Sequence, residues 1–81
     1  MRRMYSQFEF DLGKHVDNVY RSLLPELKDA PSQRVEVNLE LRNDMVKLHI
    51  NSDDIVSFRA ALNTWLRLVK VAYDMAKWKT A

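Results

Sequence analysis

The chain has 81 residues, no cysteine, one glycine and two prolines, and its formal net charge is +2. This length predicts a single domain, residues 1–81, close to the lower size limit for a self-sufficient core, and the absence of cysteine excludes disulfides and thiolate metal sites. We therefore expect association with another chain to supply part of the stability. The mild positive charge permits a nucleic-acid partner without requiring one.

The first predicted elements are a strand and a helix. Apolar residues alternate with polar ones from Met4 to Leu12, the period-two pattern of a half-buried strand. After Gly13, residues spaced three and four apart predict one apolar helix face: Val16, Val19, Tyr20, Leu23 and Leu24. Asp11 and Asp17 suit the positive end of the helix dipole. Pro25 is expected to end the regular helix, with at most one further turn through residues 26–27.

A hairpin follows the loop-like residues 28–33. Alternation over residues 34–42 and again over residues 45–50 predicts two strands, and Asn43-Asp44 forms the two-residue turn because both residue types tolerate left-handed backbone angles. This turn places three pairs opposite one another: Leu41 with Val46, Leu39 with Leu48, and Val37 with Ile50. All six residues then lie on one face, which is the buried face.

The last predicted element is one long helix over residues 52–78, with Ser52 as its cap and Asp53 and Asp54 in its first turn. Its polar residues form one narrow stripe at helical spacing: Arg59, Asn63, Arg67, Lys70, Asp74 and Lys77. Nearly everything off the stripe is apolar. Because such a helix is about 38 Å long and apolar on several sides, surface remains after folding, and we expect a partner to cover it.

The element order β-α-β-β-α predicts an α+β fold. A right-handed crossover makes strands one and two parallel, with strand three antiparallel between them and two helices on one face of the sheet. This is a ferredoxin-like unit without its final strand. The edge of strand one is then open, and a symmetric dimer through that edge is the simplest way to cover it.

The sequence contains no motif typical of a catalytic or metal-binding site. His15 and His49 are far apart on faces expected to be exposed, Asp53-Asp54 is explained by capping, and no glycine-rich loop or nucleophile motif occurs. We therefore expect no catalytic residue, metal or cofactor. The basic start lacks the apolar run of a signal peptide and no segment is long enough to span a membrane, so a cytoplasmic location is expected.

The helix also carries two tryptophans and several cations. Trp65 and Trp78 lie on its apolar side, which favours packing in the core or at a protein interface over stacking on bases. The cations of the polar stripe are typical of a solvated face, but they are also candidates for RNA contact: Arg59, Arg67, Lys70 and Lys77.

Two segments resemble a known family. Residues 52–67 carry an Asp near the helix start, an Arg-Ala step, Asn-Thr and Leu-Arg, in the motif positions Asp54, Arg59, Ala60, Asn63, Thr64, Leu66 and Arg67. Residues 19–26 resemble a first helix ending in Ser-Leu-x-Pro-Glu. Together they resemble the Pcc family, the small non-catalytic subunits of the KEOPS complex, from about Phe8 to Lys77. Thr64 and Phe58 are mild departures from its pattern.

The resemblance implies a role in making threonylcarbamoyl-adenosine in tRNA. Such a subunit forms a homodimer, docks its helices on the Kae-type catalytic subunit and assists tRNA binding. The residues expected to divide between core, dimer and partner contacts are Val19, Tyr20, Leu23, Phe58, Leu62, Trp65, Leu66 and Val69. Two alternatives stay open: a paralogue that caps the complex as a heterodimer partner, and a stand-alone nucleic-acid-binding module using the stripe and Arg34, Arg42 and Lys47.

Overall fold

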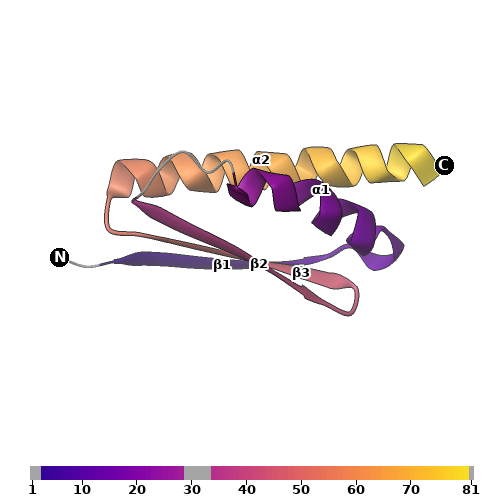
Figure 1. The fold of residues 1–81 in the computed structure, drawn as a ribbon, viewed down its shortest axis with the longest axis horizontal. Helices are drawn as coiled ribbons and strands as arrows, with labels where there is room; N and C mark the ends of the chain where they lie inside the picture. The colour runs from indigo at the N-terminus through magenta and orange to yellow at the C-terminus, as the bar shows by residue number, and fades with distance from the viewer. Residues whose placement is uncertain (1–2, 29–33, 81) are drawn as a thin grey trace.

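Two helices lie side by side on one face of a three-stranded sheet in the computed structural model, which describes residues 3–28 and 34–80 (Figure 1). The elements follow in the order β1 (Met4–Asp11), a 3₁₀ turn (Gly13–His15), α1 (Val16–Lys28), β2 (Val35–Arg42), β3 (Met45–Ser52) and α2 (Ile55–Thr80). The predicted α+β fold is confirmed. Of the predicted loop, only Lys28 is described, and it ends α1; residues 29–33 lie outside the described part.

The sheet has the strand order β1-β3-β2, with β3 antiparallel to both neighbours. The hairpin pairs Leu41 with Val46, Leu39 with Leu48 and Val37 with Ile50, as the alternation predicts. Asn43 supplies the left-handed backbone angle of the turn, with φ of 52°. Asp44 does not adopt such an angle, but its carbonyl accepts a 2.8 Å hydrogen bond from the Leu12 N–H, which fixes the end of β1 against the hairpin.

The entry into α1 differs from the prediction. Gly13 adopts φ of 55°, and the 3₁₀ turn that follows rotates His15 inward, where only 8% of its surface is exposed. Its ring meets the Tyr73 ring edge to face, with centroids 5.7 Å apart. The expectation of an exposed His15 is therefore wrong. The tight 3₁₀ turn before the helix changes the direction in which the His15 side chain points, so the residue does not follow the helical spacing of α1.

Pro25 does not end α1 either, since the helix continues to Lys28. A proline inside a helix removes one backbone donor, so the carbonyl four residues earlier, that of Arg21, loses its partner. Arg21 is exposed, and water can donate to its carbonyl in place of the missing N–H.

The start of α2 is capped by Asp54 rather than by Ser52. The Asp54 carboxylate accepts a 2.9 Å hydrogen bond from the N–H of Ser57, which is the third residue of α2. Ser52 is the last residue of β3 and is fully buried. Its hydroxyl donates to the carbonyl of Arg34 at 2.8 Å and accepts from the Asp54 N–H at 3.1 Å. Ser52 thus joins the starts of β2 and α2, and Asp53 stays outside the helix.

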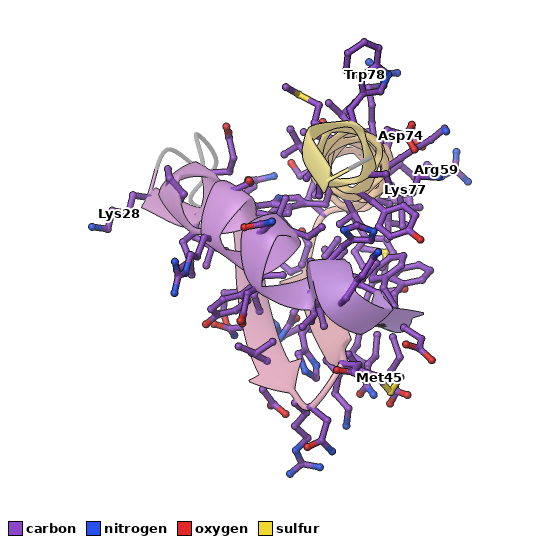
Figure 2. All side chains as sticks on the ribbon, turned by 90° about the vertical axis from the view of Figure 1, so that its right-hand side faces the viewer. Lys28, Met45, Arg59, Asp74, Lys77 and Trp78 are labelled. Carbon is purple, nitrogen blue, oxygen red and sulfur yellow. The ribbon has the colours of Figure 1, made fainter. Side chains whose placement is uncertain are left out.

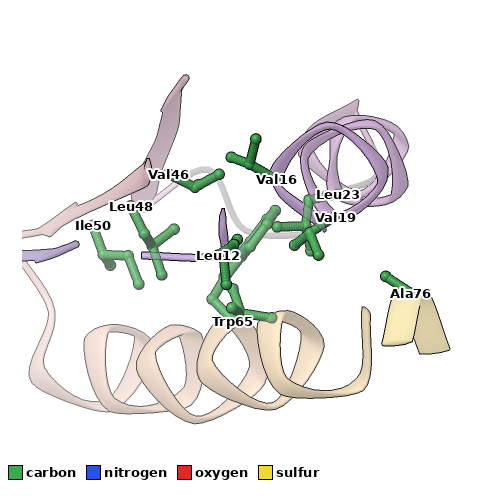
Figure 3. Packing of buried hydrophobic residues seen from close by; sticks show 10 residues of the cluster. Leu12, Val16, Val19, Leu23, Val46, Leu48, Ile50, Trp65 and Ala76 are labelled. Atoms are coloured by element: carbon green, nitrogen blue, oxygen red, sulfur yellow. The ribbon is translucent and has the colours of Figure 1, made fainter. Parts of the chain in front are cut away.

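The core lies between the sheet and the two helices (Figure 3). Val46, Leu48 and Ile50 of the central strand are completely buried. They face Trp65 and Val69 of α2 and the buried side of α1, which consists of Val16, Val19 and Leu23. Because the central strand lies beneath both helices, the core is complete there and less complete toward both outer strands, where Phe8 and Phe10 of β1 are half-buried and Leu41 of β2 is 39% exposed.

Candidate interaction surfaces

The long helix leaves apolar surface uncovered, as its sequence predicts. All six stripe residues are exposed, and several apolar residues off the stripe are exposed as well, including Val71 (50%), Met75 (58%) and Trp78 (86%). Trp78 points away from the sheet (Figure 2). The two tryptophans therefore have separate environments: Trp65 belongs to the core and Trp78 to the surface.

One uncovered region, the edge surface, follows β1. Phe8 and Phe10 lie on the inner face of this edge strand, with ring centroids 6.3 Å apart and an angle of 21° between the rings. Both stay half-buried because the helix layer does not close over them. The adjacent side of α2 adds further half-buried or exposed residues. The edge surface comprises Phe8, Phe10, Ile55, Phe58, Leu62, Leu66 and Tyr73.

The second region, the helix groove, runs between α1 and α2 on the layer's other side. It has a volume of about 410 Å³. Its floor and rim consist of Asn18, Arg21, Ser22, Leu23 and Glu26 from α1, and of Leu68, Val71, Ala72, Met75 and Ala76 from α2. The exposed ring of Trp78 extends the apolar row Val71–Met75 by one further turn of the helix. The groove and the edge surface thus lie on different sides of α2.

The interface residues expected from the sequence divide into two sets. Val19, Leu23, Trp65 and Val69 are buried in the chain's own core. Tyr20, Phe58 and Leu62 are half-buried, and Leu66 is 36% exposed. The sequence pattern did not single out Phe8, Phe10, Tyr73, Val71 or Met75, and it indicated Trp78 only as a core or interface residue. Their apolar character was visible, but which side of each element stays uncovered depends on how the two helices share the sheet.

The polar stripe of α2 has cations of two kinds. Lys70 pairs with Asp74 at 3.2 Å, and the Lys77 ammonium lies 4.8 Å from the centroid of the Tyr73 ring. Arg59 and Arg67 form no ion pair with any residue in the described part of the chain. The two arginines are therefore available to an external anion.

The outer face of the sheet is electrically balanced. Lys47 pairs with Glu9 at 3.5 Å, Arg3 with Glu36 at 3.2 Å, and Arg42 lies 3.8 Å from Glu40. Every one of these cations faces a carboxylate on the same surface. This face therefore lacks the excess positive charge that nucleic-acid backbones attract.

The described residues contain no cluster of three or more His, Cys, Asp or Glu side chains suited to a metal ion. The nearest approach to reactive chemistry is on the sheet's outer face, where the Tyr5 hydroxyl lies 2.6 Å from Nδ1 of His49. His49 Nε2 is 3.9 Å from the Glu40 carboxylate. Among the described helices, none is both long and apolar enough to cross a membrane.

The family motif occupies one side of α2. Asp54 caps the helix, and hydrogen bonds from the Ser57 side chain and backbone N–H hold the pKa of its carboxyl below the ordinary value of 3.8. The Arg34 guanidinium, 3.6 Å away, acts in the same direction. The other motif residues are all exposed and lie outside the chain's own core: Arg59, Ala60, Asn63, Thr64, Leu66 and Arg67.

This combination defines a class of protein: a small α+β domain of truncated ferredoxin-like topology with two uncovered apolar surfaces. The chain belongs to the Pcc1 family, because a family model described as "Transcription factor Pcc1" matches residues 6–77. It is also 33% identical over 67 residues to the "KEOPS complex subunit Pcc1" of Pyrococcus abyssi (strain GE5 / Orsay). That match covers 83% of this chain and 82% of the relative. The resemblance inferred from the helix motif is thus confirmed.

Proposed function

We propose that this chain is a non-catalytic scaffold subunit of a KEOPS complex that makes threonylcarbamoyl-adenosine in tRNA. The observation that carries the proposal is the pair of separate apolar surfaces on one small domain. One surface serves a second copy of the chain and the other a larger partner. The membership of the Pcc1 family and the name of the Pyrococcus relative support the assignment to this complex.

The edge surface fits a second copy. The strand β1 is an edge strand with unpaired backbone groups on its free side, and the half-buried Phe8 and Phe10 lie directly beside that edge. A two-fold axis normal to the sheet pairs β1 with β1 of the partner in antiparallel fashion and keeps both helix layers on the same side. The same contact then covers Leu66 and Tyr73 of each copy.

The helix groove fits helices of the Kae-type catalytic subunit. A groove between two helices, with apolar residues at one-turn spacing along its rim, is the usual acceptor for an amphipathic helix. Val71, Met75 and Trp78 provide that row, and tryptophan is frequent among the residues that dominate interface energies. Because the groove and the edge surface do not overlap, one dimer can hold two catalytic subunits.

Two substitutions of the same kind test this division. Leu66→Asp should convert the dimer into a monomer, because it places a charge in the edge surface, and should leave the groove intact. Met75→Asp should leave the dimer intact and abolish capture of the catalytic subunit. Both residues are exposed, so both variants should fold. Light scattering after gel filtration and a pull-down with the purified catalytic subunit give the two readouts. Equal effects of the two variants on both assays would contradict the proposal.

The two alternatives have their own tests. A paralogue that caps the complex would exchange into a heterodimer when mixed with the ordinary subunit, and native mass spectrometry detects that exchange. A stand-alone nucleic-acid module would use the cations of the stripe together with Arg34, Arg42 and Lys47, and removing Arg42 and Lys47 would then weaken RNA binding. The charge balance of the outer sheet face favours the scaffold over that module.

A further inference from the structure

The helix groove has two walls of different chemistry. The wall from α2 is apolar throughout and consists of Leu68, Val71, Ala72, Met75 and Ala76. The wall from α1 is polar except for the buried Leu23 and carries Asn18, Arg21, Ser22 and Glu26. An occupant that fits both walls therefore has an apolar side and a polar edge, which is the pattern of an amphipathic helix.

The two charges of the α1 wall are not neutralised within the chain's described ranges, 3–28 and 34–80. Arg21 and Glu26 are both exposed, and neither forms an ion pair with a residue of those ranges. Asp17 lies one turn before Arg21 but does not pair with it, and the residue one turn after Arg21 is Pro25. Both charges are thus available to an occupant of the groove.

The position of Glu26 within α1 is electrostatically unfavourable. The helix ends at Lys28, so Glu26 lies in its last turn, where the carbonyl groups concentrate partial negative charge. Lys28, the cation of that turn, projects away from α2 and does not pair with Glu26 (Figure 2). A cation brought by the occupant would remove this repulsion, because the Glu26 carboxylate lines the groove.

We propose that Arg21 and Glu26 select and orient the helix that occupies the groove, by pairing with one acidic and one basic residue on its polar edge. This inference rests on the proposed docking of the catalytic subunit in the helix groove. Arg21 and Glu26 are five residues apart, about 7.5 Å along the axis of α1. An acid and a base one turn apart, about 6 Å along the docked helix, match that separation.

The order of the two charges gives the docked helix a direction. The helices α1 and α2 run in opposite directions, so Arg21 lies nearer than Glu26 to the C-terminal end of α2 (Figure 1). A docked helix with its acid toward that end forms both pairs, whereas the reversed helix brings like charges together at both positions. The apolar wall then supplies most of the affinity, and the charged wall supplies the direction and the choice of partner.

The test measures the affinity of the full chain for the purified catalytic subunit by calorimetry, at about 50 mM and about 300 mM salt. Glu26→Lys should weaken binding at least tenfold at low salt, because it brings like charges together, and the loss should shrink at high salt. The same variant should raise the melting temperature of the free chain, since it places a cation at the negative end of α1. A purely structural role of Glu26 would instead lower the melting temperature and the affinity together.

A matched pair of double variants separates the groove from the rest of α1. Arg21→Glu/Glu26→Lys keeps the net charge and should also weaken binding at least tenfold. The control Asp17→Lys/Lys28→Glu keeps the net charge as well, changes two exposed residues of α1 outside the groove lining, and should alter the affinity less than threefold. Circular dichroism checks that both double variants are folded. Equal losses in the two double variants, or an unchanged affinity in Glu26→Lys, would overturn the inference.

Met75→Asp in the same assay distinguishes this inference from the proposed function. Lost capture in Met75→Asp together with unchanged affinity in the charge variants would refute the role of Arg21 and Glu26 and leave docking in the groove intact. Unchanged affinity in Met75→Asp would refute docking in the groove, and the inference with it.

Discussion

Phe8 and Phe10 stack against each other on the inner face of the edge strand β1, with ring centroids 6.3 Å apart, and both remain half-buried. α2 packs mainly on the central strand β3 and α1 mainly on β2, so the helix layer covers these rings of β1 only in part. An apolar pair beside an open sheet edge is the feature that most directly indicates association with a second chain.

Truncation of one ring should therefore weaken the dimer more than it weakens the fold. We expect Phe8→Ala to raise the dimer dissociation constant about tenfold or more, corresponding to at least about 1.4 kcal/mol of lost burial at the interface. Tyr5→Ala, on the opposite face of the same strand, is the control and should change the constant little. Sedimentation equilibrium gives both values; equal effects would place the contact elsewhere.

His15 carries a buried Nδ1 atom with no hydrogen-bond partner in the described chain. A buried polar atom without a partner costs stability, and an apolar ring of similar shape avoids that cost. We expect His15→Phe to raise the free energy of unfolding by about 1 kcal/mol while keeping the edge-to-face contact with Tyr73. His15→Ala should instead destabilise the chain, because it leaves a cavity. Thermal melts followed by circular dichroism compare the two; a loss of stability in His15→Phe would mean that Nδ1 is satisfied.

Ser52 joins three segments through one buried hydroxyl. Ser52→Ala leaves the Arg34 carbonyl and the Asp54 N–H without this partner, and we expect it to cost about 1–3 kcal/mol of unfolding free energy. Ser22→Ala is the matched control, because the Ser22 hydroxyl is exposed and donates to the Asn18 carbonyl within α1. Urea titrations measure both. A smaller effect for Ser52 than for Ser22 would contradict its joining role.

The cap of α2 should make stability depend on pH. The folded pKa of Asp54 lies below its ordinary value of 3.8, owing to hydrogen bonds from Ser57, so the ionised cap stabilises the fold above about pH 4. That contribution is lost as the pH falls through the folded pKa. Asp54→Asn should flatten the melting-temperature profile between about pH 5 and pH 2, whereas Asp53→Asn, outside the helix, should not. Parallel profiles for the two variants would refute this role.

Trp78 offers a direct probe of the helix groove. Trp65 is buried and Trp78 is 86% exposed, so only the second indole can move from water into a protein contact. Binding of the catalytic subunit should shift the emission of the chain to shorter wavelength, and Trp78→Phe should abolish that shift. A shift that persists in Trp78→Phe would show that the partner occupies another surface.

Much of the fold could be predicted because local signals agreed. The turn at Asn43-Asp44 and the alternation of Leu39, Leu41, Val46 and Leu48 independently specify one register, and the structure has that register. The polar stripe of α2 likewise follows from helical spacing alone. These features depend on residues close together in sequence, for which periodicity is a direct physical constraint.

The errors occur where elements meet. His15 is buried because a 3₁₀ turn precedes α1, and Asp54 replaces Ser52 as the cap because β3 extends to Ser52. Pro25 stays within α1 because its surroundings are exposed. The division of the apolar residues between core, edge surface and helix groove depends on the placement of both helices over the sheet. That placement is a tertiary property that periodicity does not determine.

The solution mass of the unaltered chain tests the central claim most directly. The chain has a mass of 9.6 kDa, so light scattering after gel filtration should give twice that value, about 19 kDa. The mass should fall to that of a single chain in Leu66→Asp and remain doubled in Met75→Asp. A single-chain mass for the unaltered protein at micromolar concentration, with the fold intact by circular dichroism, would contradict pairing through the open edge of β1.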